Sequence, residues 1–204
     1  MYWKPSDGSG KVERLTESAA AEWPEAVTPD GGVLFITALA EGSMDILQLD
    51  LKASSGPEPF VRADAVEHFP SVSPDGRFLA YESFRSGVPE IYVRTFPEGD
   101  GPWQISNEGG KVPRWSPDGR ELFYLDDGAM IGVAIETEPA FRTVGTRKLF
   151  EGNYYDRAHS YDVSRDGTRF IMIQQDAGYY SDVGSDLVVV LDWFEELKRL
   201  VPID

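Results

Sequence analysis

A four-residue signal that occurs four times constrains the fold of this chain more than any other feature. Each copy consists of Ser or Thr, one further residue, and then Asp-Gly. The second residue is Pro in three of the four copies. The copies are Thr28–Gly31, Ser73–Gly76, Ser116–Gly119 and Ser164–Gly167. Their aspartates, at 30, 75, 118 and 166, lie 45, 43 and 48 residues apart. A nearly fixed spacing of this size indicates an array of one supersecondary unit.

Each signal has the chemistry of a tight turn between two strands. Pro presets φ at the second turn position, Asp hydrogen-bonds nearby backbone, and Gly accepts a positive φ. The residues after each turn are apolar at consecutive positions, as in Leu79-Ala80-Tyr81. Because successive side chains of a strand point to opposite faces, we predict that this strand is buried on both faces, between neighbouring sheets.

Two further strands are predicted in most units. Third strands are expected at 45–51, 90–96, 130–135 and 186–192, and fourth strands near 58–62, 103–106 and 147–150. An N-terminal strand pair is expected at 2–4 and 13–16. Four antiparallel strands at this period are typical of a propeller blade. The predicted fold class is therefore all-β, a β-propeller of four-stranded antiparallel blades with about four blades per chain.

We predict one propeller domain over residues 1–204. Its expected units are a partial blade (1–18), three blades (19–63, 64–107 and 108–151), an incomplete last blade (152–192) and a C-terminal helix or tail (193–204). The helix is predicted because Phe194, Leu197, Leu200 and Val201 have helical spacing.

Two ways of closing the ring remain open. The N-terminal strand pair closes a small ring, or two chains complete a larger one. Open sheet edges are pairing liabilities, and symmetric dimers are the commonest oligomers. We therefore favour a homodimer.

Composition excludes several classes of function. The net charge is −16, and no stripe of Lys and Arg is present to neutralise phosphates, so nucleic-acid binding is disfavoured. The acidic charge indicates a solvated surface or, alternatively, attraction for a basic partner or cations. The lack of cysteine excludes disulfides, thiol catalysis and thiolate metal sites. The sequence shows neither a signal peptide nor an apolar run long enough to span a membrane.

A candidate binding site follows from the register of the repeats. The residues seven places before each repeat aspartate enter the innermost strands, so we expect them to ring one mouth of the central channel. We predict a ligand-binding pocket there, against the alternative of a hydrated channel mouth with ordinary polar side chains. The predicted pocket consists of Trp23, His68, Lys111 and His159, backed by Glu67, Arg114, Arg157 and Asp162.

Catalytic motifs are weak. There is no Gly-x-Ser-x-Gly nucleophile elbow, and two separated histidines do not make a metal motif. The repeat aspartates lie in different blades, so a turn-forming role explains them better than calcium binding. We predict no catalytic residues, no metal and no cofactor. His68 or His159 with Asp162 and a serine gives a hydrolytic alternative.

Two stretches carry a resemblance to a known family. Ser73–Tyr81, followed by Ile91–Val93, resembles the WD-like repeat of TolB-type β-propellers, and Ser116–Tyr124 repeats the pattern. The resemblance covers nearly the whole chain. Segment 192–200 also resembles the end of large bacterial proteins that carry such propellers as sensor or binding domains, some of them membrane-bound serine/threonine kinases. Related propellers precede the hydrolase domain of prolyl-oligopeptidase-like peptidases.

The resemblance implies a function and a location. TolB-family propellers contact envelope partners, including a peptidoglycan-associated lipoprotein. We therefore expect a non-catalytic module that binds a protein, peptide or other ligand at the channel mouth, within a bacterial envelope or sensor protein that is periplasmic or extracellular. The alternatives are a hydrolase, either esterase or peptidase, with a histidine at the channel mouth, and a truncated structural fragment, because the chain opens inside a blade.

Overall fold

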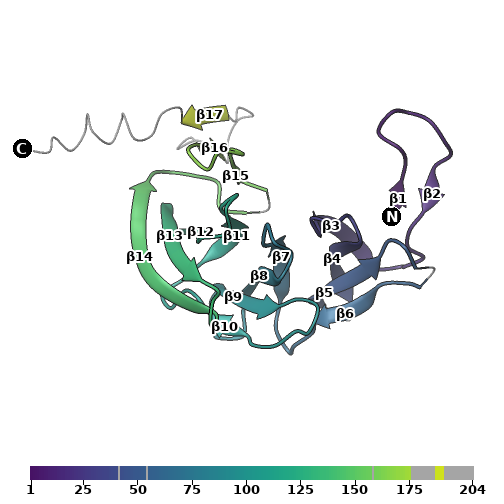
Figure 1. Cartoon of the computed structure of the whole chain (residues 1–204), viewed down its shortest axis with the longest axis horizontal. Helices are drawn as coiled ribbons and strands as arrows, with labels where there is room; N and C mark the ends of the chain where they lie inside the picture. Colours follow the sequence, from purple (N-terminus) through teal and green to yellow (C-terminus); the bar gives the residue numbers. More distant parts are fainter. Residues whose placement is uncertain (41, 54, 158, 176–186, 191–204) are drawn as a thin grey trace, which may run out of the picture.

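The computed structural model describes residues 1–40, 42–53, 55–157, 159–175 and 187–190. These residues form seventeen strands, β1 to β17, and no helix, and all strand pairs are antiparallel. The sheets stand side by side in an arc, like the blades of a propeller (Figure 1). The predicted all-β propeller class is therefore confirmed. The predicted C-terminal helix, with Phe194, Leu197, Leu200 and Val201, lies outside the described residues.

Three four-stranded sheets form the body of the arc, and in each the strands follow chain order. The first sheet contains β3 (Ala21–Val27), β4 (Val33–Ala40), β5 (Ser43–Asp50) and β6 (Glu58–Val61). The second contains β7 (Glu67–Val72), β8 (Phe78–Ser83), β9 (Glu90–Thr95) and β10 (Trp103–Gln104). The third contains β11 (Lys111–Trp115), β12 (Glu121–Asp126), β13 (Ala129–Glu136) and β14 (Arg142–Glu151).

Smaller sheets stand at the two ends of the arc (Figure 1). One is the hairpin of β1 (Tyr2–Trp3) and β2 (Glu13–Arg14), and the other contains β15 (Tyr161–Val163), β16 (Phe170–Ile173) and β17 (Leu187–Val190). The first strand of each larger sheet lies toward the centre of the arc (Figure 1). Ring closure and the favoured homodimer stay predictions.

The repeated signal forms the same turn in all four copies. In the second copy, the Ser73 hydroxyl donates to Asp75 Oδ1 at 2.6 Å, and this oxygen also accepts from the Arg77 amide at 3.1 Å. The Gly76 amide donates to the Ser73 carbonyl oxygen at 2.9 Å, and Gly76 has a φ of 75°. Each aspartate at the corresponding position accepts the same pair of hydrogen bonds. These contacts assign the repeat aspartates to turn formation, as predicted.

Successive turns also pack on one another. A Cβ atom added to Gly76 would lie 3.4 Å from Pro29 of the preceding turn, and the same relation joins Gly119 to Pro74 and Gly167 to Pro117. Proline in one turn therefore supports glycine in the next. The fourth turn has Arg165 where the others have proline.

Replacing Gly76 by alanine is expected to lower the free energy of unfolding by about 1–2 kcal/mol, because a side chain at φ 75° clashes with its own backbone. Chemical denaturation measures the change. Gly145→Ala is the matched control, because Gly145 lies on β14 with open space around its Cβ position and no positive φ. Equal stability of the two variants would contradict the proposed role of the turn.

The core lies between neighbouring sheets rather than inside any one of them. All six residues of β8 are buried. Phe78 and Ala80 pack toward the third sheet, whereas Leu79 and Tyr81 pack toward the first. The predicted strand with two buried faces is thus confirmed in the second unit. A further cluster joins the third sheet to the last, and Met1 and Leu15 pack on the free face of the first sheet.

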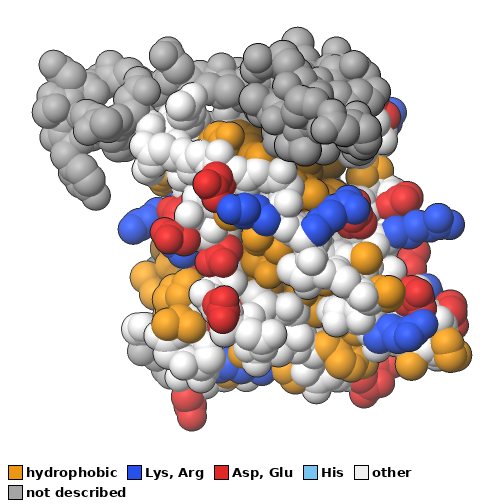
Figure 2. Space-filling view, turned by 90° about the vertical axis from the view of Figure 1, so that its left-hand side faces the viewer, with side chains coloured by type: hydrophobic (Ala, Val, Ile, Leu, Met, Phe, Trp, Pro, Cys, Tyr) orange, Lys and Arg blue, Asp and Glu red, His pale blue; other side chains and the backbone are white. Residues whose placement is uncertain are grey.

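The outer surface is charged and mixed. Figure 2 shows the β14 side of the molecule, where Lys and Arg side chains are interspersed with Asp and Glu. Ion pairs there join Arg147 to Glu121 at 2.7 Å, Arg142 to Glu136 and Lys148 to Glu151. The described residues contain no helical segment that could span a membrane.

Candidate functional site at the channel mouth

A β-bulge recurs in the innermost strand of each full sheet. The pairing register shifts between Pro24 and Ala26, between His68 and Ser71, and between Lys111 and Arg114. Each bulge begins at or next to the residue seven places before the repeat aspartate. It inserts one extra residue, so a residue three positions further on faces the same side. Bulges of this kind re-aim side chains and are frequent beside functional sites.

The third of these bulges is strained and held by its neighbours. Val112 has a φ of 53°, which is a genuine outlier for a β-branched residue. Its amide donates to Glu82 Oε2 of the second sheet at 3.1 Å, and its carbonyl oxygen accepts from the Tyr161 hydroxyl of the last sheet at 2.8 Å. One strained residue therefore ties three sheets together around the channel.

A cavity of about 710 Å³ opens at this level. Trp23, His68, Lys111 and His159, the four residues predicted to ring the channel mouth, all line it, together with the predicted Arg157. The structure thus brings these five residues together, while their role in ligand binding stays a prediction. The other lining residues are Pro24, Glu25, Thr37, Met44, Phe69, Glu82, Phe84 and Asp156.

Three predicted residues lie elsewhere. Arg114 and Asp162 line an adjoining cavity of about 570 Å³, which shares Glu25 and His159 with the first. Glu67 lines neither cavity: its carboxylate is fully buried and accepts from the Ser83 hydroxyl at 3.0 Å and from Arg85 at 3.2 Å. Glu67 is therefore separated from the channel mouth by its own sheet contacts.

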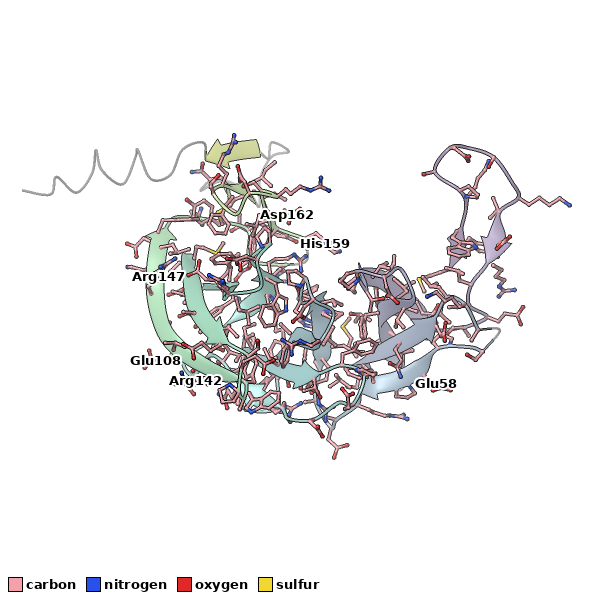
Figure 3. The ribbon with its side chains drawn as sticks, viewed as in Figure 1. Glu58, Glu108, Arg142, Arg147, His159 and Asp162 are labelled. Atoms are coloured by element: carbon pink, nitrogen blue, oxygen red, sulfur yellow. The ribbon has the colours of Figure 1, made fainter. Side chains whose placement is uncertain are left out.

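His159 links three elements across the channel. Figure 3 shows His159 on the inner side of the arc near Asp162, whereas Glu58 and Arg147 lie on the outer rim. Arg114 Nη2 lies 3.2 Å from His159 Nδ1, and His159 Nε2 lies 3.6 Å from Glu25 Oε2. Because arginine can only donate, Nδ1 accepts and the imidazole proton is on Nε2, facing the carboxyl group of Glu25. Burial, together with the Arg114 charge, lowers the pKa of His159.

His68 and Glu82 form a second imidazole–carboxyl pair, in which both side chains are largely buried. His68 Nε2 lies 3.8 Å from Glu82 Oε1, and the imidazole packs against Phe69 and Phe84 with ring centroids 4.1 and 5.9 Å away. Burial lowers the pKa of His68 to about 4 and raises the pKa of Glu82 to about 7. The neighbouring Lys111 is engaged in an ion pair with Asp156. At neutral pH, Glu82 therefore faces a neutral imidazole.

Several lining residues were not predicted from the sequence. Thr37 and Glu82 occupy the same position in successive repeats, seven places after the turn aspartate, directly after an apolar stretch. A polar residue directly after the consecutive apolar positions of the same strand was a usable signal. Phe84 follows the end of β8, and Met44 lies on β5, so the strand register did not point to them.

The described residues give little support for catalysis or metal binding. Neither histidine hydrogen-bonds a serine hydroxyl in this part of the chain, and Asp162 accepts from the Val163 amide at 2.8 Å. Among the same residues, no group of three or more His, Cys, Asp or Glu side chains is arranged to hold a metal ion.

Comparison with known proteins places the fold. No family model matches the chain. The curated Tol-Pal system protein TolB of Desulfosudis oleivorans is 29% identical over 119 residues, which cover 56% of this chain and 26% of that protein. The crystal structure of TolB from Acinetobacter baumannii superposes with a TM-score of 0.69 at 20% identity, covering 90% of this chain and 44% of that one.

Other solved structures extend the likeness to proteins with different activities. The proposed TolB of Agrobacterium tumefaciens gives a TM-score of 0.66 at 20% identity, covering 86% of this chain and 64% of that one. A puromycin-hydrolyzing peptidase from Mycobacterium tuberculosis gives a TM-score of 0.63 at 17% identity, covering 82% of this chain and 31% of that one. Such a shared fold does not assign an activity.

The chain is a β-propeller, and its fold is TolB-like, which confirms the resemblance seen in the repeats. It spans about a quarter of the length of the curated relative, and 44% and 64% of the lengths of the two TolB-type structures.

Proposed function

We propose that this propeller segment is a non-catalytic binding module that takes part of a protein or peptide partner into the cavity at its channel mouth. The observation that carries the proposal is the cavity itself. Its volume of about 710 Å³ lies within the usual range for ligand pockets, and five aromatic or apolar residues line it together with eight polar or charged ones. Three sheets and the loop before β15 contribute to it, so a ligand there would contact most of the arc.

Trp23 is the expected anchor for the partner. Its side chain is 42% exposed although it lines the cavity, and exposed tryptophan beside an apolar pocket is typical of binding hot spots. The likeness to a Tol-Pal system protein supports a setting in a bacterial envelope or sensor protein, periplasmic or extracellular. The esterase or peptidase alternative has no comparable support from the residues around His68 and His159.

Trp23→Ala is expected to weaken partner binding about tenfold or more, because it removes the exposed anchor of the cavity. Twelve-residue peptides selected from a random display library on the wild-type chain provide the ligands. Their dissociation constants for the wild type and the variant are then measured by fluorescence anisotropy.

Trp3→Ala is the matched control, because Trp3 is 44% exposed and lies on β1, away from the channel mouth. The selected peptides are expected to bind Trp3→Ala within about twofold of wild type. Failure to select any peptide, or affinity that survives Trp23→Ala but is lost in Trp3→Ala, would refute the proposed function. Circular dichroism confirms that both variants remain folded.

A further inference from the structure

Two buried carboxyl groups form part of the cavity wall. The Glu25 side chain on β3 is 5% exposed and the Glu82 side chain on β8 is 3% exposed, and both line the cavity. A carboxylate removed from water is costly unless a positive charge and hydrogen bonds compensate it. The immediate partners of these two groups therefore determine what the cavity favours.

Neither carboxyl group forms an ion pair with Lys or Arg among the described residues. Glu25 faces the imidazole of His159, and the nearby Arg114 directs its donor to that ring. Glu82 faces the imidazole of His68 and accepts from the Val112 amide, while Lys111 is held by Asp156. In both places an imidazole stands where a cation would neutralise the charge.

The electrostatics agree with this geometry. Burial lowers the pKa of both imidazoles, so they are largely neutral at pH 7. Burial also raises the pKa of Glu25, and the Thr37 hydroxyl and then Arg114 oppose this rise. Burial raises the pKa of Glu82 to about 7; the Val112 amide and Lys111 oppose this rise, and Asp156 adds to it. The positive charges near each carboxyl group therefore do not fully compensate its negative charge.

The remaining walls suit a cation. Trp23, Phe69 and Phe84 present aromatic rings around the same cavity, and aromatic faces attract ammonium and guanidinium groups. The net charge of −16 also creates a negative long-range potential, which attracts cations. Arg157, on the loop before β15, also lines the cavity and opposes this preference, which makes it useful for a test.

We infer that the cavity accepts a cationic side chain, arginine or lysine, from the bound partner, with Glu25 and Glu82 as its counter-ions. This inference rests on the proposed function and specifies the chemistry of the ligand. An incoming guanidinium or ammonium group supplies the charge that the two imidazoles do not. Aromatic rings cover its apolar stem.

The test uses the peptides selected on the wild-type chain. Peptides sensitive to Trp23→Ala are expected to be enriched in Arg or Lys. Replacing the critical arginine by citrulline, which has the same shape without the charge, should weaken binding to wild type about tenfold. In Glu82→Gln the arginine peptide should lose most of this advantage, so that the two peptides differ by less than about threefold.

Two further variants test whether the arginine preference is local to the cavity and whether the cavity favours positive charge. Glu58→Gln changes the net charge equally but lies on the outer strand β6 (Figure 3), so the arginine preference should persist in it. Arg157→Gln should tighten binding of the arginine peptide. Calorimetry at pH 7 in two buffers should show proton release on binding, because the cation favours ionised Glu82.

The outcomes separate the two proposals. Peptides that depend on Trp23 but lack Arg and Lys, or that bind citrulline as well as arginine, would overturn this inference and leave the proposed function standing. Weaker binding in Arg157→Gln would indicate an anionic ligand and would also overturn it. An equal loss of arginine preference in Glu58→Gln would show a general charge effect rather than a site.

Discussion

Leu122→Ala is expected to lower the free energy of unfolding by about 2–5 kcal/mol. Leu122 lies on β12, is fully buried, and packs in the cluster between the second and third sheets. Truncation removes buried apolar area and leaves a cavity that rigid neighbouring sheets cannot close. Urea denaturation followed by tryptophan fluorescence measures the change.

The matched control is Leu39→Ala, because Leu39 occupies the equivalent second strand of the first sheet but is 41% exposed. Its free energy of unfolding is expected to change by no more than about 0.5 kcal/mol. Similar losses in the two variants would show that the stability of the chain does not reside between the sheets.

Glu82→Gln is expected to gain stability relative to wild type as the pH rises. Burial raises the pKa of Glu82 from 4.5 to about 7, so the folded state holds a proton that the unfolded state releases between these values. The contribution of Glu82 is therefore fully present below pH 4.5 and is lost as the pH rises through about 7. At about 1.4 kcal/mol for each tenfold change in proton affinity, the loss reaches about 3 kcal/mol by pH 8.

A glutamine at position 82 does not ionise, so the variant does not lose this stability as the pH rises. Its side-chain oxygen still accepts from the Val112 amide. The stability difference, variant minus wild type, should therefore increase by about 3 kcal/mol between pH 4.5 and pH 8. His68 titrates in the opposite sense, losing stability as the pH falls from 6.5 to about 4, in both proteins. Glu58→Gln, at an exposed position of β6, is the control for the change in net charge. A flat profile for Glu82→Gln would mean that folding does not raise the pKa of Glu82.

Local chemistry explains why the sequence predicted so much of the fold. The Ser73, Asp75 and Gly76 turn is closed by its own residues, so its hydrogen bonds follow from the motif alone. The strand with two buried faces follows from consecutive apolar positions, as at Leu79 and Ala80. Strand ends were predicted less well: β14 begins at Arg142, five residues before the predicted start.

The candidate site depends on contacts between sheets, which a single repeat does not encode. The repeat register identified Trp23 and His68 because equivalent positions converge at one mouth of the arc. It also included Glu67, which the Ser83 and Arg85 contacts hold away from the cavity. Glu25 was missed, because the repeat register does not show that its carboxyl group is buried or that His159, from the loop before β15, lies 3.6 Å away.

Photo-crosslinking tests directly whether a peptide binds at the channel mouth. A selected peptide carrying a benzophenone side chain is irradiated on the wild-type chain, and the labelled residues are located by mass spectrometry. Attachment is expected at cavity residues such as Trp23, Met44, Phe69 and Phe84. Attachment confined to exposed residues elsewhere, such as Tyr2 on the terminal hairpin or Val144 on β14, would contradict binding at the channel mouth.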